Sequence, residues 1–383
     1  MQNRRSDFVN LKQNFFVMLI LLSRFIYSLN WFVISPALPA IASSGDMQQW
    51  MIGTIPLVFF IFTGVSQIPS GMVSNKLGAP STYSIGLILL SFGNILLIIN
   101  QNFIWVFLTR ALSGIGAALF FASAGGVLLN LKPEKPGLMM GLYNVAFALG
   151  GGAGLLWGVI HEVLGWKTGI LLAGLLGVIV AVVSYIPTHK IKWIGKFSIQ
   201  DAIGQLRDKN IVNVSIAFTG SWGAYLATGL LLPTYLELGL QQGQAVSGLI
   251  SAPLLFASIF GGLSAALYDK VKRKKIILFM AGFLSVFPAA FFGLLSKFIV
   301  ELLLILGFFN EMAITMCYAQ GNNTYPEKNT ASFAVINTIQ ILLGMLLLPL
   351  VTIIASFSWV YAWIAMSLLG LAPLVFILRL EVR

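Results

Sequence analysis

The chain has 383 residues, of which 58% are apolar and only 9% are charged, and its formal net charge is +11. A soluble domain carries about 25% charged residues, so this composition excludes a globular protein whose surface faces water. Apolar runs of about 20 residues recur along the chain, and each is long enough to cross the hydrocarbon core of a bilayer as a helix. Ten-residue segments of alternating polarity, typical of a membrane β-barrel, are absent. The composition predicts an all-α polytopic membrane protein.

Breaks at polar, glycine and proline clusters divide the chain into twelve candidate spans. They cover residues 14–41, 48–72, 80–99, 103–130, 137–160, 166–187, 210–238, 243–267, 275–295, 298–321, 330–353 and 357–379. With the N-terminus in the cytoplasm, 19 of the 23 Lys and Arg residues fall in cytoplasmic segments and two in outer loops. Because basic residues concentrate on the cytoplasmic side, this bias predicts that both termini are cytoplasmic. Topology therefore explains the positive charge, and no nucleic-acid partner is expected.

The first span carries an arginine, Arg24, in the apolar run LLSRFIYSLNW. The span is too long for the core of a signal peptide and no small-residue cleavage site follows it, so we expect a retained helix. Arg24 lies about ten residues, or ~15 Å, into this helix, close to the bilayer midplane. A charge there costs ~3 kcal/mol on insertion scales and usually faces a bundle interior or a wet cavity. We expect Arg24 to mark a functional site.

The loop after the second span reads QIPSGMVSNKLG, and a similar loop, AALYDKVKRKK, lies about 194 positions later. Glycine allows tight backbone turns, so the first copy predicts a hinge with turns at Gly71 and Gly78. The repeat indicates a duplicated architecture, and we interpret both loops as a gating latch. The gating residues are Gly71, Asn75, Lys76 and Gly78 in the first copy, and Asp269, Lys270 and Arg273 in the second.

Spans four and five carry two further patterns. Span four contains the run RALSGIG, which begins at Arg110, about seven residues in from the outer side. Span five contains Gly141, Gly150, Gly154 and Gly158. Small residues at this spacing give a flat face that a neighbouring helix can approach closely. The face could serve packing alone or form a sliding surface between two halves of the molecule.

The longest polar segment, residues 188–209, divides the chain into parts of similar length. The domain prediction is a first six-helix bundle at 1–187, a basic cytoplasmic linker at 188–209 and a second six-helix bundle at 210–383. The stretch FSIQDAIGQLRDK within the linker could form an interfacial amphipathic helix. Two basic-flanked halves of six spans are typical of transporters built from repeats.

Span ten contains the one acid near the bilayer midplane, Glu311, about 14 residues past the outer Lys297. Burial favours the protonated form of a carboxyl group, so Glu311 could carry a coupling proton. It could equally hold an arginine neutral when no substrate is bound. The single cysteine, Cys317, excludes an intramolecular disulfide and is expected to be a packing residue.

These motifs together resemble the major facilitator superfamily of secondary transporters, over the whole chain. Gly71, Lys76 and Gly78 match its loop pattern G-x-L-A-D-R-x-G, with Asn75 in place of the usual acid. The run RALSGIG resembles the fourth-helix pattern R-x-x-x-G-x-G. The span-five glycines resemble the family's antiporter motif, and LGWKTGI the entry to its sixth helix. The resemblance implies twelve helices in two pseudo-symmetric bundles, a monomer, and a central cavity lined by helices one, four, seven and ten.

By this numbering the three deep charges, Arg24, Arg110 and Glu311, all lie on cavity-lining helices. Guanidinium groups match carboxylate and phosphate bidentately, so two arginines in one half favour an anionic substrate. The predicted substrate-binding residues are Arg24, Arg110, Tyr27, Asn30, Trp222 and Tyr225, with Glu311 as the proton-coupling residue. Structural alternatives remain open: Arg110 could be bonded within the first half, Arg24 could snorkel to the cytoplasmic surface, and Glu311 could pair with Asn310.

No phosphate-binding loop, metal-ligand cluster or nucleophile–base pair is present in the sequence, so we expect no enzymatic activity, no cofactor and no metal. The predicted function is a plasma-membrane secondary transporter that moves a small organic anion by alternating access, coupled to H+. The alternative is a drug-type proton-coupled efflux antiporter for hydrophobic or cationic compounds. The span-five glycines favour that alternative, whereas Leu155, where the antiporter motif has proline, weighs against it. A lipid scramblase or a transporter-like sensor forms a third class.

Overall fold

The computed structural model describes residues 2–132, 134–189, 198–264, 272–324 and 329–381. Twelve of its helical segments are long and apolar enough to cross a membrane, and each overlaps one predicted span, which confirms the predicted class and span count. We call spans one to six the first half and spans seven to twelve the second half. The described residues contain no β-strand.

The first half is built from short and long helices in chain order: α1 (Gln2–Phe32), η1 (Ser35–Ala37), α2 (Leu38–Ser44), η2 (Gln49–Met51), α3 (Thr54–Leu77), α4 (Ala79–Leu97), α5 (Phe103–Leu131), α6 (Pro136–Leu156), α7 (Gly158–Leu164) and α8 (Trp166–Thr188). The connector contributes α9 (Ile199–Gln205). The second half comprises α10 (Lys209–Ala217), α11 (Thr219–Leu238), α12 (Gln244–Ser251), α13 (Pro253–Ser264), α14 (Lys274–Leu284), η4 (Phe287–Phe291), η5 (Ser296–Phe298), α15 (Ile299–Thr324), α16 (Asn329–Gly344), α17 (Leu347–Ala355), α18 (Trp359–Leu371) and η7 (Ala372–Arg379).

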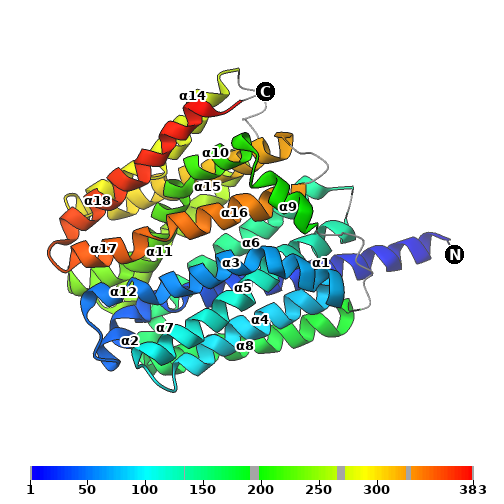
Figure 1. Cartoon of the computed structure of the whole chain (residues 1–383). Helices are drawn as coiled ribbons and strands as arrows, with labels where there is room; N and C mark the ends of the chain where they lie inside the picture. Colours follow the sequence, from blue (N-terminus) through cyan, green and yellow to red (C-terminus); the bar gives the residue numbers. More distant parts are fainter. Residues whose placement is uncertain (1, 133, 190–197, 265–271, 325–328, 382–383) are drawn as a thin grey trace.

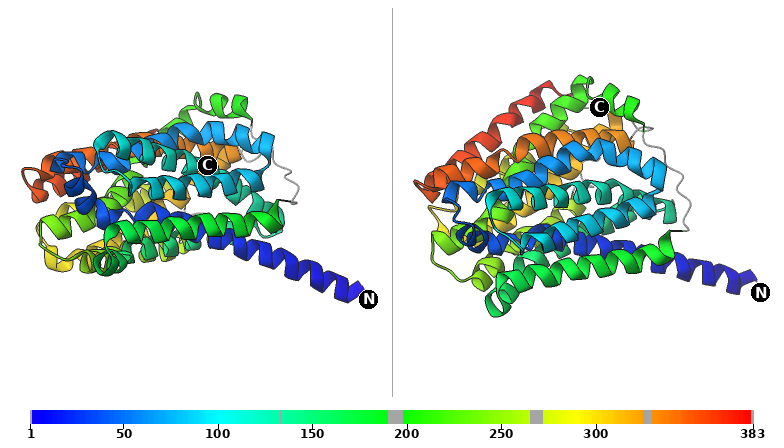
Figure 2. Two further views of the ribbon diagram at one scale, coloured as in Figure 1. Left: turned by 90° about the horizontal axis from the view of Figure 1, so that it is seen from below. Right: turned by 60° about the horizontal axis from the view of Figure 1, so that its bottom comes forward.

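The spanning helices run side by side, and both chain ends lie toward the same end of the bundle (Figure 1). We call this the terminus end and the other the opposite end. The first turns of α1 extend beyond the bundle at the terminus end (Figure 2). Several spans consist of two helices, and in some of them a proline lies at the junction, where its missing N–H interrupts the helical hydrogen bonds. Pro36 lies in η1 between α1 and α2, and Pro253 begins α13 after α12.

One helix in each half is largely enclosed by its neighbours. In the second half, α11 packs against α16 and α18, and every residue from Thr219 to Leu236 is buried. Gly220 of α11 lies so close to the backbone of Gly370 in α18 that a methyl group there would collide with the Gly370 carbonyl. In the first half, α1 packs against α6 and α8. Helices α1 and α11 therefore provide the inner surfaces from which a central site can be built.

The two halves are bonded to each other at the opposite end. Ser35 donates from its hydroxyl to the carbonyl oxygens of Gly229 and Leu230, at 3.0 and 2.8 Å. Thr352 donates to the carbonyl of Trp50 at 2.9 Å, joining α17 to η2. A carboxylate from α7 also accepts a bond from the start of α12, as described below. The structure is therefore a form in which the halves are closed together at the opposite end.

The first gating loop differs in part from the sequence prediction. Helix α3 continues to Leu77, five residues past the predicted end of span two, so Gly71 lies inside the helix and the predicted turn there is wrong. Asn75 and Lys76 lie in the last helical turn. Gly78 does make the turn, with φ +82°, a conformation that L side chains rarely adopt. Of the second copy, Arg273 immediately precedes α14, while Asp269 and Lys270 lie outside the described residues.

The span-five glycines serve two interfaces. Gly150 and Gly154 lie against the backbone carbonyls of Phe25 and Leu29 in α1, within the first half. Gly158 instead lies against the carbonyl of Gln244 at the start of α12, across the boundary between the halves. Gly141 has no heavy atom of another element within 4 Å of an added methyl group. The face is thus a packing surface at its centre and an interface between the halves near the opposite end.

Candidate functional site

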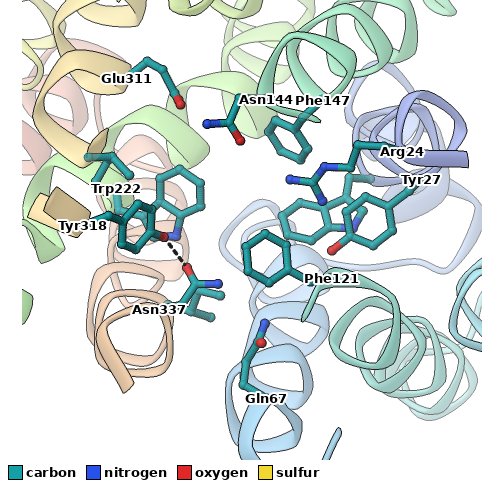
Figure 3. A pocket seen from close by; sticks show the side chains of 13 residues that line it. Arg24, Tyr27, Gln67, Phe121, Asn144, Phe147, Trp222, Glu311, Tyr318 and Asn337 are labelled. Atoms are coloured by element: carbon teal, nitrogen blue, oxygen red, sulfur yellow. Dashed lines mark hydrogen bonds between the residues drawn. The ribbon is translucent and has the colours of Figure 1, made fainter. Parts of the chain in front are cut away.

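A pocket lies between the two halves and holds about 50 Å³ of space for water-sized molecules, enough for a few waters or one small ligand. The first half supplies Arg24, Tyr27, Trp31, Gln67, Phe121, Asn144 and Phe147. The second half supplies Trp222, Glu311, Ile314, Tyr318, Asn337 and Ile341. Figure 3 shows these side chains converging on a common space. Spans two, five and eleven contribute, in addition to the expected spans one, four, seven and ten.

Arg24 lies among four aromatic rings. Its Cζ atom is 4.2 Å from the ring centre of Tyr143, 4.5 Å from Phe147, 4.9 Å from Tyr27 and 5.1 Å from Phe121. The electron-rich face of such a ring attracts a cation by ~0.5–2 kcal/mol, which offsets much of the cost of placing the charge here. The residue is only 4% exposed. Arg24 therefore points into the pocket and does not snorkel to a membrane surface.

Hydrogen bonds to α5 fix two of these rings. The Tyr27 hydroxyl donates to the carbonyl of Ala117 at 3.2 Å, and the Tyr143 hydroxyl donates to that of Phe121 at 2.8 Å. The Tyr27 ring also stacks on Phe120, with centroids 4.4 Å apart. Because both hydroxyls bond to backbone, neither tyrosine is free to rotate away from the arginine. The guanidinium group is held in place before any ligand arrives.

Two nitrogen atoms of Arg24, Nε and Nη1, are buried and have no hydrogen-bond partner among the described residues. A buried donor without a partner costs about 1–3 kcal/mol, and most buried polar atoms in proteins are bonded. An anion in the pocket would remove this cost through charge-assisted hydrogen bonds. The aromatic rings stabilise the positive charge, and the hydroxyls of Tyr27 and Tyr143, which lie beside the guanidinium group, do not meet Nε or Nη1 at full hydrogen-bond geometry.

Glu311 lies on the other side of the pocket from Arg24, with Asn144 between them (Figure 3). The Glu311 side chain passes over Gly262 of α13, and a methyl group there would approach its Cγ atom within 3.2 Å. Gly262 thus leaves room for the carboxylate to reach the pocket. The pocket contains one basic and one acidic side chain from different halves, and an uncharged amide separates them.

Asn337 and Tyr318 are bonded to each other across the second half. The Tyr318 hydroxyl donates to Oδ1 of Asn337 at 3.0 Å (Figure 3). With its oxygen engaged, the amide of Asn337 can offer N–H donors to a ligand. Gln67 and Asn144 add two further amide groups on the first-half side. Most polar groups of the pocket can therefore donate hydrogen bonds, and Glu311 is the only carboxylate among its lining residues.

Arg110 and Asn30, both predicted to bind substrate, do not line this pocket. Arg110 is 1% exposed and donates from Nη1 to Oδ1 of Asn94 at 2.7 Å. Asn94 in turn donates to the carbonyl of Asn30 at 2.9 Å, and Asn30 donates to the carbonyl of Ala173 at 3.1 Å. This chain joins α5, α4, α1 and α8. The geometry thus favours the structural alternative for Arg110.

We expect the substitution Asn94→Leu to destabilise the fold strongly. It would leave the buried Arg110 guanidinium without its acceptor, and hydrogen bonds to charged groups contribute about 1.5–3 kcal/mol. The midpoint of thermal unfolding in detergent measures the loss. The double variant Asn94→Leu/Arg110→Met removes the orphaned charge and should recover stability relative to Asn94→Leu alone. The double variant should also retain ligand binding. Loss of binding in a folded double variant would show that Arg110 belongs to the binding site.

The two predicted residues on α11 differ in their placement. Trp222 lines the pocket, whereas Tyr225 does not and stacks on the Trp222 ring at 6.1 Å between centroids. Tyr225 is fully buried, so it contributes to the packing of the indole and not to the pocket lining. Of the six predicted substrate-binding residues, the structure brings Arg24, Tyr27 and Trp222 together at the pocket, with Glu311 opposite.

Sequence reasoning missed most of the other lining side chains. Gln67, Asn144 and Asn337 are isolated amides within apolar spans, and an intramembrane polar residue is itself a signal that could have identified them. The aromatic residues Trp31 and Phe147 gave no such signal, because aromatic side chains are common throughout the spans. Phe147 is distinguished only by its contact with Arg24, and Trp31 only by its place in the lining of the pocket.

The sequence profile of the Major Facilitator Superfamily matches residues 20–349. The chain belongs to this superfamily. Members of the superfamily are generally carriers without enzymatic activity. Together with bacterial relatives, the twelve spans identify a multi-pass protein of the plasma membrane.

Curated relatives are similar at low identity. The probable nitrate transporter NarT of Staphylococcus haemolyticus is 24% identical over 65% of this chain and 65% of its own length. The nitrite extrusion protein of Bacillus subtilis is 23% identical over 77% and 73%. The quinolone resistance protein NorA of Staphylococcus aureus is 24% identical over 74% and 72%. The chain thus spans just under two thirds of the length of the NarT relative.

A solved structure confirms the fold. A bacterial homolog to the human lysosomal transporter Spinster, in an inward-facing and unoccupied conformation, superposes with a TM-score of 0.74. It is 14% identical and covers 96% of this chain and 95% of its own. At this identity the likeness concerns the fold alone. It supports the division into two six-helix bundles, which remains a prediction in its residue boundaries.

Proposed function

We propose that this superfamily member is a secondary transporter that carries a small anion, coupled to H+, by alternating access. One observation carries the proposal: Arg24, buried between the halves with two N–H donors that no described residue accepts. A guanidinium group binds oxyanions bidentately, and its aromatic surroundings hold it in position without neutralising it. The transporter acts as a monomeric carrier with neither cofactor nor enzymatic chemistry.

Two relatives named for anions support this reading. Both the probable nitrate transporter NarT and the nitrite extrusion protein carry names of small inorganic oxyanions. The small size of the pocket is consistent with such ligands as well as with small organic acids. The substrate class is therefore wider than the organic anion predicted from sequence, and the shared feature is a compact negative group that binds Arg24.

The position of the site between the halves supports alternating access. The halves are bonded together at the opposite end, so in this form the substrate would reach the pocket from the terminus end. With cytoplasmic termini, as the distribution of basic residues predicts, this is the inward-facing form. Rocking of the halves about the pocket would break the bonds at the opposite end and open the site outward. Glu311, on the second half, would bind or release H+ as the halves move.

This movement must break a hydrogen bond that the Glu162 carboxylate accepts from the second half. Its Oε2 atom accepts the backbone N–H of Ala245 at 2.8 Å, so α7 of the first half caps α12 of the second. Loss of a helix cap costs about 0.5–2 kcal/mol, a shift of roughly 2- to 30-fold in an equilibrium. We expect Glu162→Ala to increase the outward-open population by that factor. Spin labels at Ser44 and Phe357, both exposed at the opposite end, would report it as a longer distance.

A Cys317→Ala background removes the native thiol, and Glu301→Ala provides the matched control. Glu301 is also an exposed acid near the opposite end, in the first turn of α15. An unchanged distance distribution in Glu162→Ala would show that the cap does not hold the closed form. An equal shift in both variants would attribute the effect to lost negative charge.

A drug-type efflux antiporter is the second candidate. It is favoured by the aromatic lining of the pocket and by the similarity to NorA. Six of the lining side chains are Tyr, Trp or Phe, and such rings bind flat hydrophobic compounds. A buried unpartnered guanidinium group, however, is an unfavourable neighbour for a cation. The pocket would also have to enlarge considerably for a drug-sized molecule.

Counterflow in proteoliposomes tests the proposal, because it measures exchange without any gradient. Vesicles would be loaded in turn with nitrate, formate, lactate and succinate, and with a panel of hydrophobic cations. We expect exchange of at least one anion and none of the cations. Exchange confined to the cations would replace the proposed function by the efflux reading. Absence of solute exchange with rapid equilibration of labelled lipid would favour a scramblase.

A further inference from the structure

We infer that the pocket selects a compact oxyanion through two indole N–H donors, Trp31 from the first half and Trp222 from the second, acting beside Arg24. This inference rests on the proposed function and names the class of anion and the residues that select it. Both tryptophans line the pocket. Neither indole N–H meets an acceptor at full hydrogen-bond geometry among the described residues, although the side chains are only 5% and 9% exposed. The Tyr27 hydroxyl lies near the Trp31 N–H, and an anion would have to take its place as acceptor.

A buried indole N–H normally finds an acceptor. Two other tryptophans in spanning helices do so: Trp105 donates to the carbonyl of Leu96 at 2.8 Å, and Trp157 to that of Gly169 at 2.9 Å. Trp363 also lacks a partner, but it does not line the pocket. The pocket therefore gathers two of these indole donors in the same small space as the two unpartnered nitrogen atoms of Arg24.

Both indoles are held rigidly by other rings. The Trp31 ring meets Phe59, Phe60 and Phe147 edge-on, at 5.1, 5.2 and 5.6 Å between centroids. Trp222 lies parallel to Tyr225, with an interplanar angle of 16°. A fixed donor loses little conformational entropy when it binds, so it contributes more to affinity than a mobile one. Both donors therefore need little reorganisation to bind a ligand.

The combination of donors and volume defines the class of ligand. An indole N–H donates and cannot accept, so neither N–H group can bind a cation. An apolar molecule would leave both N–H groups unsatisfied, at about 1–3 kcal/mol each. An oxyanion with oxygens on several sides can accept from Arg24 and from both indoles at once. The pocket has room for a few water molecules, so we expect it to favour a compact anion over benzoate or citrate.

The two donors belong to different halves, and this gives them different roles. Arg24 and Trp31 share α1, so their contacts with the anion persist whichever way the halves rock. Trp222 lies on α11 and meets the same anion only when the second half is in place. A ligand can shift a conformational equilibrium only through unequal affinity for the two forms. The Trp222 contact supplies that inequality, whereas the Trp31 contact contributes to affinity in both forms.

The substitutions Trp31→Phe and Trp222→Phe test the inference, because each retains an aromatic ring and removes the N–H. Trp363→Phe is the matched control, since it deletes a buried unpartnered indole N–H away from the pocket. Nitrate, formate, benzoate and citrate serve as probes in equilibrium titration and in counterflow. In the unmodified chain, nitrate and formate should bind at least 10-fold more tightly than benzoate and citrate.

Both pocket variants should weaken nitrate binding about 10-fold or more, and Trp363→Phe should leave it unchanged. Trp31→Phe should raise KM with little change in the maximal exchange rate, while Trp222→Phe should also lower that rate. Unchanged nitrate affinity in both pocket variants, with anion exchange intact, would overturn the inference and leave the proposed function standing. Equal or better binding of benzoate would overturn the size selection. Failure of every anion to bind the unmodified chain would instead defeat the proposed function itself.

Discussion

Arg24→Gln is expected to reduce anion exchange by at least 100-fold in kcat/KM. The substitution removes the positive charge and both unpartnered donors, Nε and Nη1, from the pocket. Two charge-assisted hydrogen bonds contribute about 3–6 kcal/mol together, which corresponds to two to four orders of magnitude in binding. Counterflow of the preferred anion in proteoliposomes, at several concentrations, measures the change. Arg24→Lys should restore little, because an ammonium group lacks the planar fork that lies among the four rings.

The thermal stability of the same variant separates binding from folding. Because no described residue accepts from Nε or Nη1, Arg24→Gln breaks no protein hydrogen bond at these atoms and relieves a buried charge. We therefore expect an unfolding midpoint equal to or above that of the unmodified chain, in contrast to Asn94→Leu. Anion exchange that persists in folded Arg24→Gln would remove Arg24 from the binding site. An unfolded Arg24→Gln protein would make the residue structural.

Glu311→Gln is expected to abolish accumulation driven by a pH gradient while leaving exchange in place. The amide has nearly the shape of the acid but cannot take up or release a proton, so it separates binding from coupling. With an inward H+ gradient, the accumulation ratio of the anion should fall to about 1. Uptake of labelled anion into proteoliposomes with and without the gradient measures this ratio.

Glu301→Gln is the matched control for the coupling prediction. This acid also lies on α15, but it is exposed in the first turn and does not line the pocket. Its accumulation ratio should equal that of the unmodified chain. Accumulation that survives in Glu311→Gln would assign the proton to another group. Loss of exchange together with accumulation would indicate that Glu311 binds the substrate.

The spanning helices could be predicted from sequence because their determinants are local. Composition and length fixed twelve spans that the structure confirms, with differences only at their ends. The largest of these differences explains the error at Gly71. The motif around Asn75 and Lys76 looked like a loop because it is polar, but helix α3 continues through it to the turn at Gly78. Local polarity does not distinguish a loop from a helix end that projects from the membrane.

The candidate site could be predicted only in part. Arg24 and Glu311 were recognisable because a charge within an apolar run is rare, and both line the pocket. Arg110 gave the same signal, yet it bonds to Asn94 inside the first half. That partner lies on another helix, 16 positions earlier, and no pattern in one sequence pairs the two. Trp31 was missed because its role depends on the absence of an acceptor for its indole N–H, and only the structure shows that absence among the described residues.

The most direct test of the central claim is a structure of the transporter with a bound anion. Selenate or bromate would be suitable, because the anomalous scattering of Se or Br locates the ion independently of the protein. We predict one peak between Arg24 and Trp222, with oxygens within hydrogen-bond distance of the guanidinium group, Trp31 and Trp222. A pocket that remains without anion at saturating concentration, or a bound cation beside Glu311, would contradict the account.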